Sequence, residues 1–135
     1  MRERILIVSG EQTNIWMRAT LARQGFSVTI TDDADKGYQQ LIESRFDLVV
    51  LSLGDSTSGL NLIKRIRTNS ELPRVSILAI AEWGTGQPTM ALTEGADGFE
   101  PEPLDDTRLL AAVARLMRPN LTMTARASGA DGDDD

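Results

Sequence analysis

Residues 47–52 read Asp-Leu-Val-Val-Leu-Ser, and the four positions between the two end residues are apolar without interruption. A strand that is apolar at every position is typical of a parallel sheet covered by helices on both faces. Ile5-Leu6-Ile7-Val8 repeats the pattern near the start of the chain. The two stretches therefore predict central strands of one buried parallel sheet.

Outside these two stretches, short apolar runs alternate with amphipathic segments. This alternation predicts β-α units wound around a parallel sheet. Further strands are expected at residues 27–30, 75–81 and 98–99. Helices are expected at residues 11–24, 34–42, 60–66 and 109–117, with a short one around residues 91–92.

Apolar residues at helical spacing indicate which face of a predicted helix is buried. Ile15, Ala19 and Ala22 are expected to face the core from the first helix. The last helix carries the clearest apolar stripe, and a carboxylate just before a helix is a favoured cap. Asp105 or Asp106 is therefore expected to cap it.

The composition excludes several classes of protein. The chain has no cysteine and no histidine, which rules out disulfides, thiolate or imidazole metal sites, and a Ser-His-Asp triad. Fourteen basic against twenty acidic residues give a net charge of −6, so nucleic-acid binding is not expected. The four apolar residues after Met1-Arg2-Glu3-Arg4 are too few for a signal peptide or a membrane span. We therefore expect a cytoplasmic protein without membrane contact.

A length of 135 residues is typical of one domain with at most a short appendage. Beyond Arg118-Pro119 the composition shifts to Thr, Ala, Ser, Gly and Asp, with almost nothing to bury. We predict a domain over residues 1–118 and a disordered acidic tail or linker over residues 119–135.

The order of motifs over residues 4–117 resembles the receiver domain of bacterial two-component response regulators. The residues that carry the resemblance are Ile5–Val8, Asp47–Leu51, Ser58-Gly59-Leu60, Gly95-Ala96-Asp97-Gly98-Phe99 and Pro103. The resemblance implies an α/β, flavodoxin-like (CheY-like) doubly wound fold. It has five parallel strands in the order 2-1-3-4-5, flanked by five helices.

Receivers of this family hold magnesium with an acidic pair after the first strand and phosphorylate an aspartate after the third. At the positions of the acidic pair this chain has Ser9 and Gly10, with Glu11 as the only neighbouring carboxylate. At the phosphoacceptor position it has Ser52, and Asp55 is an alternative acceptor nearby. A serine needs an adjacent base to act as a nucleophile. The resemblance therefore extends to the framework and not to these chemical groups.

The remaining family positions also differ. The switch hydroxyl of the family falls on Ile80, or on Ala79 if the alignment slips by one residue. The family's lysine falls on Glu102, which reverses the charge. Phe99 matches the aromatic switch position and is expected to keep one packed state.

These departures lead to the hypothesis of a pseudo-receiver. It would be a response-regulator signalling module of a two-component phosphorelay system that acts by protein–protein interaction, independently of phosphorylation. We expect no enzymatic activity, no cofactor, and weak or no magnesium binding. Trp83 and Phe99 are candidate contacts on the surface that receivers form from the fourth helix, fifth strand and fifth helix, and a homodimer is one candidate complex.

Two alternatives stay open from the sequence. The first is an active receiver that takes phosphate on Asp55 or Ser52. The second is a small flavodoxin-like enzyme or nucleotide binder, because this topology places ligands at the carboxyl ends of strands. The loops lack a phosphate-binding glycine series with a lysine, which disfavours the second alternative.

Overall fold

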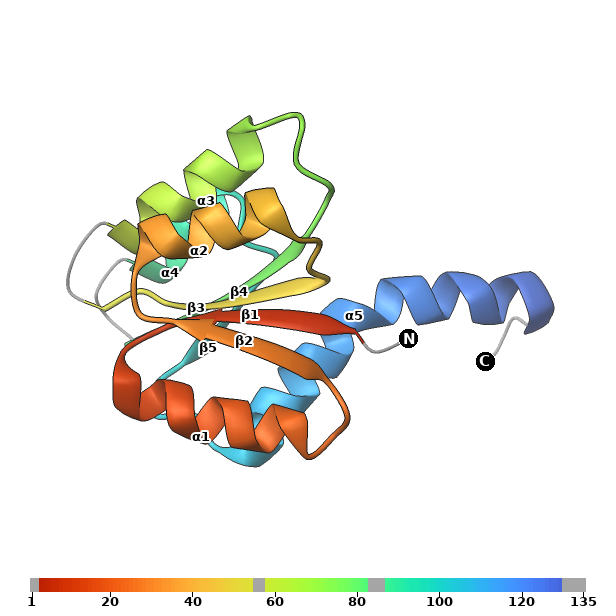
Figure 1. Cartoon of the computed structure of the whole chain (residues 1–135). Coiled ribbons are helices and arrows are strands. Elements are labelled where there is room, and N and C mark those ends of the chain that lie inside the picture. Colours follow the sequence, from red (N-terminus) through yellow and green to blue (C-terminus); the bar gives the residue numbers. More distant parts are fainter. Residues whose placement is uncertain (1–2, 55–57, 83–86, 130–135) are drawn as a thin grey trace.

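A computed structural model describes residues 3–54, 58–82 and 87–129. Five parallel strands form one sheet in the order β2-β1-β3-β4-β5, which confirms the predicted topology (Figure 1). The strands are β1 (Arg4–Val8), β2 (Ser27–Thr31), β3 (Leu48–Ser52), β4 (Ser76–Ala81) and β5 (Gly98–Pro101).

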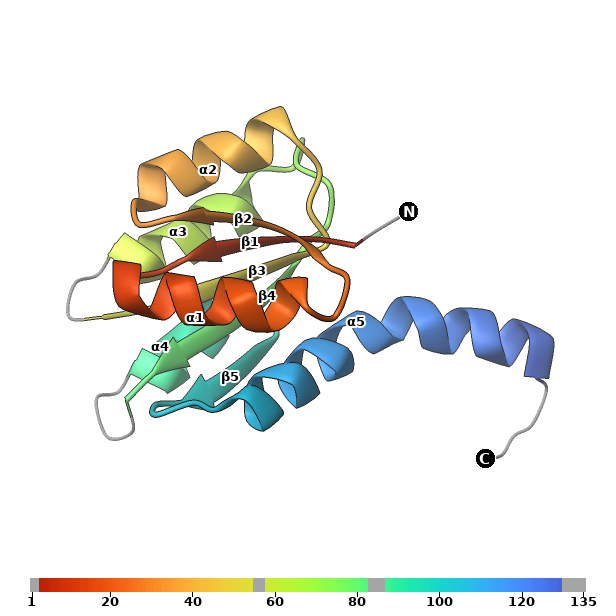
Figure 2. The ribbon, with the colours of Figure 1, turned by 60° about the horizontal axis from the view of Figure 1, so that its bottom comes forward.

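Helices cover both faces of the sheet, so the flavodoxin-like fold class is confirmed. The helices are α1 (Glu11–Ala22), α2 (Ala34–Glu43), α3 (Ser58–Thr68), α4 (Gln87–Glu94) and α5 (Asp106–Gly129). Helices α1 and α5 lie on one face, and α2, α3 and α4 lie on the other (Figures 1 and 2). In the described ranges, no helix combines the length and hydropathy needed to cross a membrane.

Alternate residues of each strand enter two separate cores. Ile5 and Ile7 of β1 pack with α1 and α5, whereas Leu6 and Val8 pack with the helices of the opposite face. All four side chains are at most 5% exposed. The uninterrupted apolar run of β1 thus has the predicted cause, a strand buried on both sides.

The helix caps follow from carboxylates that precede the helices. Asp33 accepts the backbone N–H groups of Asp35 and Lys36 at the start of α2. Asp105 accepts the backbone N–H of Arg108 at 2.9 Å, so Asp105 is the cap of α5. The capping bonds satisfy N–H groups that have no partner inside the helix.

The predicted buried face of α1 is wrong. Ile15 is 68% exposed, and Ala19 and Ala22 also lie on the solvent side. The buried positions are Met17, Thr20 and Leu21. A polar residue occupies this stripe because the Thr20 hydroxyl donates to Asp106 of α5 at 3.1 Å.

The backbone of helix α5 continues beyond residue 118, and the division into a domain over residues 1–118 and a tail over residues 119–135 stays a prediction. The α5 backbone stays helical from Asp106 to Gly129, past Pro119 and through most of the segment predicted as a disordered tail. Residues 130–135 lie outside the described residues.

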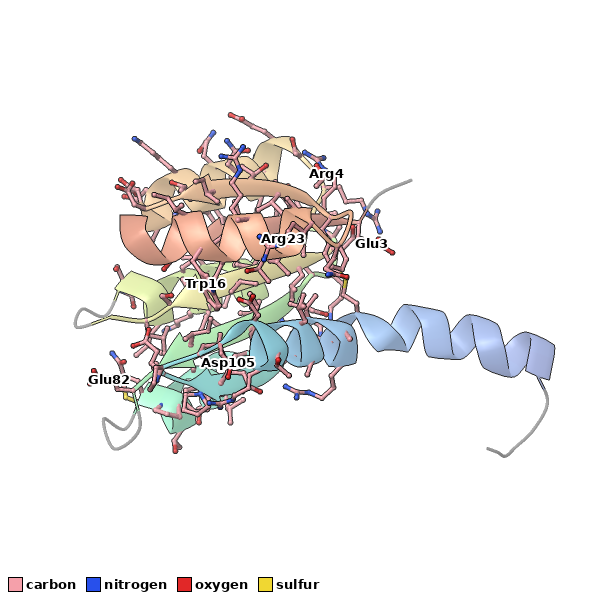
Figure 3. All side chains as sticks on the ribbon, turned by 90° about the horizontal axis from the view of Figure 1, so that it is seen from below. Glu3, Arg4, Trp16, Arg23, Glu82 and Asp105 are labelled. Carbon is pink, nitrogen blue, oxygen red and sulfur yellow. The ribbon has the colours of Figure 1, made fainter. Side chains whose placement is uncertain are left out.

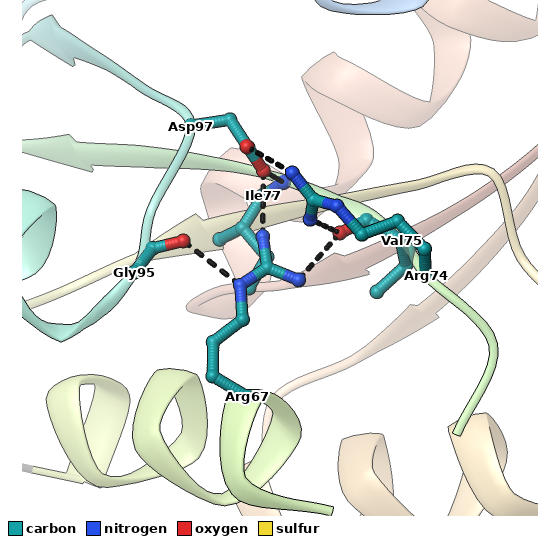
Figure 4. A network of polar contacts seen from close by, with 6 residues as sticks. All are labelled: Arg67, Arg74, Val75, Ile77, Gly95 and Asp97. Atoms are coloured by element: carbon teal, nitrogen blue, oxygen red, sulfur yellow. Dashed lines mark hydrogen bonds and ion pairs between the residues drawn. The ribbon is translucent and has the colours of Figure 1, made fainter. Parts of the chain in front are cut away.

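A polar network ties α3 and the turn before β5 to the amino ends of the strands (Figure 4). Asp97, in that turn, accepts from the guanidinium of Arg67 at 2.6 Å and from that of Arg74 at 2.7 Å. Its carboxylate also accepts the backbone N–H of Ile77 on β4 at 2.8 Å. Asp97 therefore joins the turn before β5 to α3 and to the start of β4.

Arg67 of α3 is the central donor of this network. It also donates to the carbonyls of Val75 and Gly95, at 2.7 and 2.9 Å. Burial, followed by the charge of Arg74, lowers the pKa of Arg67, and Asp97 opposes the shift. Gly95 has φ +124°, and a Cβ there would lie 2.6 Å from Cγ of Arg67, so the contact requires glycine.

We predict that Asp97→Ala lowers the free energy of unfolding by about 2 kcal/mol, because it leaves partly buried guanidinium and amide donors without their acceptor. Urea denaturation measures the change. The matched control is Asp35→Ala. It removes the salt bridge between Asp35 and Arg65, in which the Asp35 side chain is 87% exposed. That change is expected to stay below about 1 kcal/mol. Equal losses for the two variants would contradict the role given to Asp97.

Candidate functional site

Two serines meet at the carboxyl ends of the central strands. Ser9 follows β1 and Ser52 ends the adjacent β3. The Ser9 hydroxyl donates to Oγ of Ser52 at 2.8 Å, and the backbone N–H of Ser9 donates to the Thr31 carbonyl at 3.0 Å. Ser9 is only 6% exposed. The structure thus brings together two sequence-predicted site residues as a neutral hydroxyl pair.

The loop after β3 is hydrogen-bonded to the start of α4. Gly54 has φ +61°, a backbone conformation that favours glycine, and its carbonyl accepts the side-chain amide of Gln87 at 2.8 Å. Gln87 begins α4. The contact therefore links the loop beside Ser52 to the start of that helix.

Ile80 occupies the position level with Ser52. The two residues are paired in the register of β3 and β4, and the Leu53 N–H donates to the Ile80 carbonyl at 2.9 Å. Ile80 is 1% exposed and belongs to the core of α1 and α5, whereas Ala79 belongs to the opposite core. Of the two sequence candidates, Ile80 is therefore the one beside Ser52, and its side chain offers no hydrogen bond.

Two glutamates lie next to each other where β4 and β5 end. Ala81 pairs with Pro101 in the register of these strands, and the Glu102 N–H donates to the Ala81 carbonyl at 3.0 Å. Glu82 and Glu102 are the next residues along the two strands, and both are exposed. Glu102, which the resemblance places at the family's lysine position, therefore lies level with a second glutamate at the strand ends.

A cavity of about 500 Å³ opens beside these glutamates. It is lined by Trp16, Met17, Ile80, Glu82, Glu102, Pro103 and Leu104. Trp16 lies between α1 and the beginning of α5, and Glu82 lies at the carboxyl end of β4 (Figure 3). The cavity therefore sits between α1 and the loop that leads into α5. We call it the α1–α5 cavity.

The other predicted site residues are placed as follows. Phe99 is partly buried and packs against the core of α2, α3 and α4. Glu11 is the first residue of α1, and its side chain lies outside the described part of the structure. Asp55 and Trp83 lie outside the described residues.

Among the described residues, the groups next to Ser9 and Ser52 do not match the ligands that a magnesium ion prefers. Mg²⁺ takes octahedral oxygen ligands and is usually held by one or two carboxylates. The hydroxyls of Ser9 and Ser52 are neutral and bonded to each other, and the Gly54 carbonyl accepts from Gln87. Among the described residues, no three Asp, Glu, His or Cys side chains converge as a metal site.

Sequence reasoning missed three features of this edge. The Ser9–Ser52 contact needs the strand order and register, and the Gln87–Gly54 bond needs the turn geometry. Glu82 was not singled out, although it follows β4 as Glu102 follows β5. Adjacent ends of β4 and β5 in the predicted strand order were the available signal for this pair.

Comparison with known proteins assigns the chain to a family. The family model described as the response regulator receiver domain matches residues 5–114. The chain belongs to this receiver family. Receiver domains are signalling modules. The match confirms the receiver framework that the sequence motifs indicated.

Curated relatives of this receiver are longer than the chain. The transcriptional regulatory protein DltR of Streptococcus agalactiae is 31% identical over 125 residues, which cover 90% of this chain and 55% of DltR. The response regulator ArlR of Staphylococcus epidermidis is 29% identical over 116 residues, which cover 84% of this chain and 52% of ArlR. The chain thus spans about half the length of these relatives.

Solved structures share the fold of this receiver at low identity. The chemotaxis protein CheY4 of Vibrio cholerae superposes with a TM-score of 0.78 at 20% identity, covering 86% of this chain and 99% of CheY4. The receiver domain of a Pseudomonas aeruginosa sensor histidine kinase has a TM-score of 0.77 at 21% identity, covering 87% and 98%. That structure holds a magnesium ion in its active site cleft.

We predict that millimolar MgCl₂ leaves the melting temperature of this receiver unchanged, because a ligand stabilises only a folded state that binds it. Differential scanning calorimetry measures the shift. The contrasting variant is Ser9→Asp/Gly10→Asp/Ser52→Asp, which restores the family's three carboxylates. At ten times its Kd, magnesium should stabilise that variant by about 1.4 kcal/mol. A dose-dependent rise for the unmodified receiver would show that this edge holds the ion after all.

Proposed function

We propose that this receiver is a phosphorylation-independent signalling module that acts in the cytoplasm by binding another protein. In this proposal the receiver scaffold has no switch chemistry and no enzymatic activity of its own. The observation that carries the proposal is the neutral Ser9–Ser52 pair at the phosphoacceptor edge, with Glu102 at the lysine position.

The hydroxyl of Ser52 is a poor phosphoryl acceptor in this setting. A serine nucleophile needs a neighbouring general base. Among the described residues, the side chain that hydrogen-bonds to Ser52 is that of Ser9, whose hydroxyl donates the bond and is itself a weak base. The chain contains no histidine that could take the proton.

The charge at this edge also disfavours a bound phosphoryl group. Like charges repel, and the repulsion strengthens where water is partly excluded. Glu82 and Glu102 both line the α1–α5 cavity, and so does Ile80. Ile80 is the residue that pairs with Ser52 in the register of β3 and β4. A phosphoryl group on Ser52 would lie at the edge of the sheet that also carries these two carboxylates, where the resemblance to the family expects a lysine.

The face made by α4, β5 and α5 is the surface that we propose for a protein partner. Met90 and Leu92 on α4 are each 50% exposed, an unusual exposure for large apolar side chains on one short helix. Glu100 of β5 forms salt bridges with Arg108 and Arg115 of α5, which brace the same face. Because Phe99 packs inward, we place the contact on α4 in place of that residue. A second copy of the chain is one candidate partner.

The test is incubation with acetyl phosphate and Mg²⁺, followed by intact mass measurement. We predict that the mass does not change. A receiver domain with the complete acidic pair, aspartate and lysine, treated in parallel, shows that the reagent works.

The second arm of this test concerns Asp55. If the unmodified receiver gained one phosphoryl group, the proposal would be wrong, and Asp55→Asn would identify the acceptor. Loss of the adduct in that variant would assign it to Asp55. Its persistence would assign it to another residue, with Ser52 the first to substitute.

A further inference from the structure

The α1–α5 cavity combines an apolar lining with two carboxylates. Trp16, Met17 and Ile80 supply apolar surface from α1 and β4, and Leu104 supplies it from the loop before α5. Glu82 and Glu102 border the same space. At about 500 Å³ the cavity is large enough for a long side chain with its terminal group.

The backbone holds the two carboxylates on neighbouring strands. The β4–β5 register pairs Ala81 with Pro101, and the Glu102 N–H bonds to the Ala81 carbonyl, so Glu82 and Glu102 are level across the strand ends. Both carboxylates border one side of the cavity, and this local negative charge favours a cationic ligand.

The aromatic and apolar part of the lining selects among cations. Trp16 is partly buried, with its indole at the cavity wall. A guanidinium stacks on an indole and forms paired hydrogen bonds with carboxylates, whereas the strongly hydrated Mg²⁺ gains nothing from Met17 or Leu104. The methylene stem of an arginine would cover the apolar lining.

We propose that the α1–α5 cavity binds an arginine side chain presented by a partner protein. The inference rests on the proposed function, because it assigns the charge-reversed edge to a cation in place of a phosphoryl group. The net charge of −6 would also attract a basic partner. This contact lies apart from Met90 and Leu92 and gives the partner a second point of attachment, beside the loop into α5.

The experiment uses the whole chain and a blocked glycyl-arginyl-glycine peptide as the probe. Two-dimensional NMR follows the indole N–H signal of Trp16, which Trp16→Phe distinguishes from that of Trp83. We expect a saturable shift of the Trp16 signal. The same peptide with citrulline, a neutral analogue of arginine, should bind with a Kd about tenfold higher.

The matched variants are Glu102→Gln and Glu71→Gln. Both residues are exposed, but only Glu102 borders the cavity. Glu102→Gln is expected to weaken arginine-peptide binding by about tenfold, the value of one charge-assisted hydrogen bond. Glu71→Gln is expected to leave it unchanged.

Several outcomes would overturn the inference. They are no shift at Trp16, equal binding of the citrulline peptide, no effect of Glu102→Gln, or a Mg²⁺ titration that displaces the arginine peptide. The phosphorylation test separates the two claims. No adduct together with no arginine binding would refute only the inference, whereas an adduct on the unmodified receiver would refute the proposed function on which it rests.

Discussion

The function that we propose depends on the hydrogen bond between Ser9 and Ser52 at the carboxyl edge of the sheet. This bond joins the ends of β1 and β3, where strand order brings two loops together, and it does so with neutral groups. A carboxylate at either position would bring a charge that needs a cation or water. With hydroxyls at both positions, the two side chains hydrogen-bond to each other. The negative charge instead lies one and two strands away, at Glu82 and Glu102.

The opposite end of the sheet is held by charge. Asp97 accepts hydrogen bonds from Arg67, from Arg74 and from the backbone N–H of Ile77. Arg67 also donates hydrogen bonds to two backbone carbonyls. The framework of this receiver is therefore stabilised by contacts far from the edge at which the resemblance places the family's chemistry. This separation allows the residues of the carboxyl edge to change while the strand order and the two cores stay the same. The family match over residues 5–114 and the low identity to solved structures agree with a conserved framework.

The sequence predicted the strands well because their apolar runs have one physical cause, burial on both faces. It failed on α1, where exposed Ile15 and buried Thr20 reverse the usual preferences through a contact with α5 that no local pattern encodes. It placed Ser9 and Ser52 at the ends of their strands, because position along a strand is a local property, and their role in a site stays a prediction. It did not identify the bonds between them, such as that of Gln87 with Gly54, because these depend on loops meeting in space.

The central claim is that the carboxyl edge does not respond to a phosphoryl group. The most direct measurement is a ¹H–¹⁵N correlation spectrum recorded with and without beryllofluoride and Mg²⁺, a mimic of the phosphoryl adduct that needs no transfer step. The account predicts that the signals of Ser9, Ser52 and Phe99 keep their positions. Shifts at these residues that saturate with the mimic would contradict it.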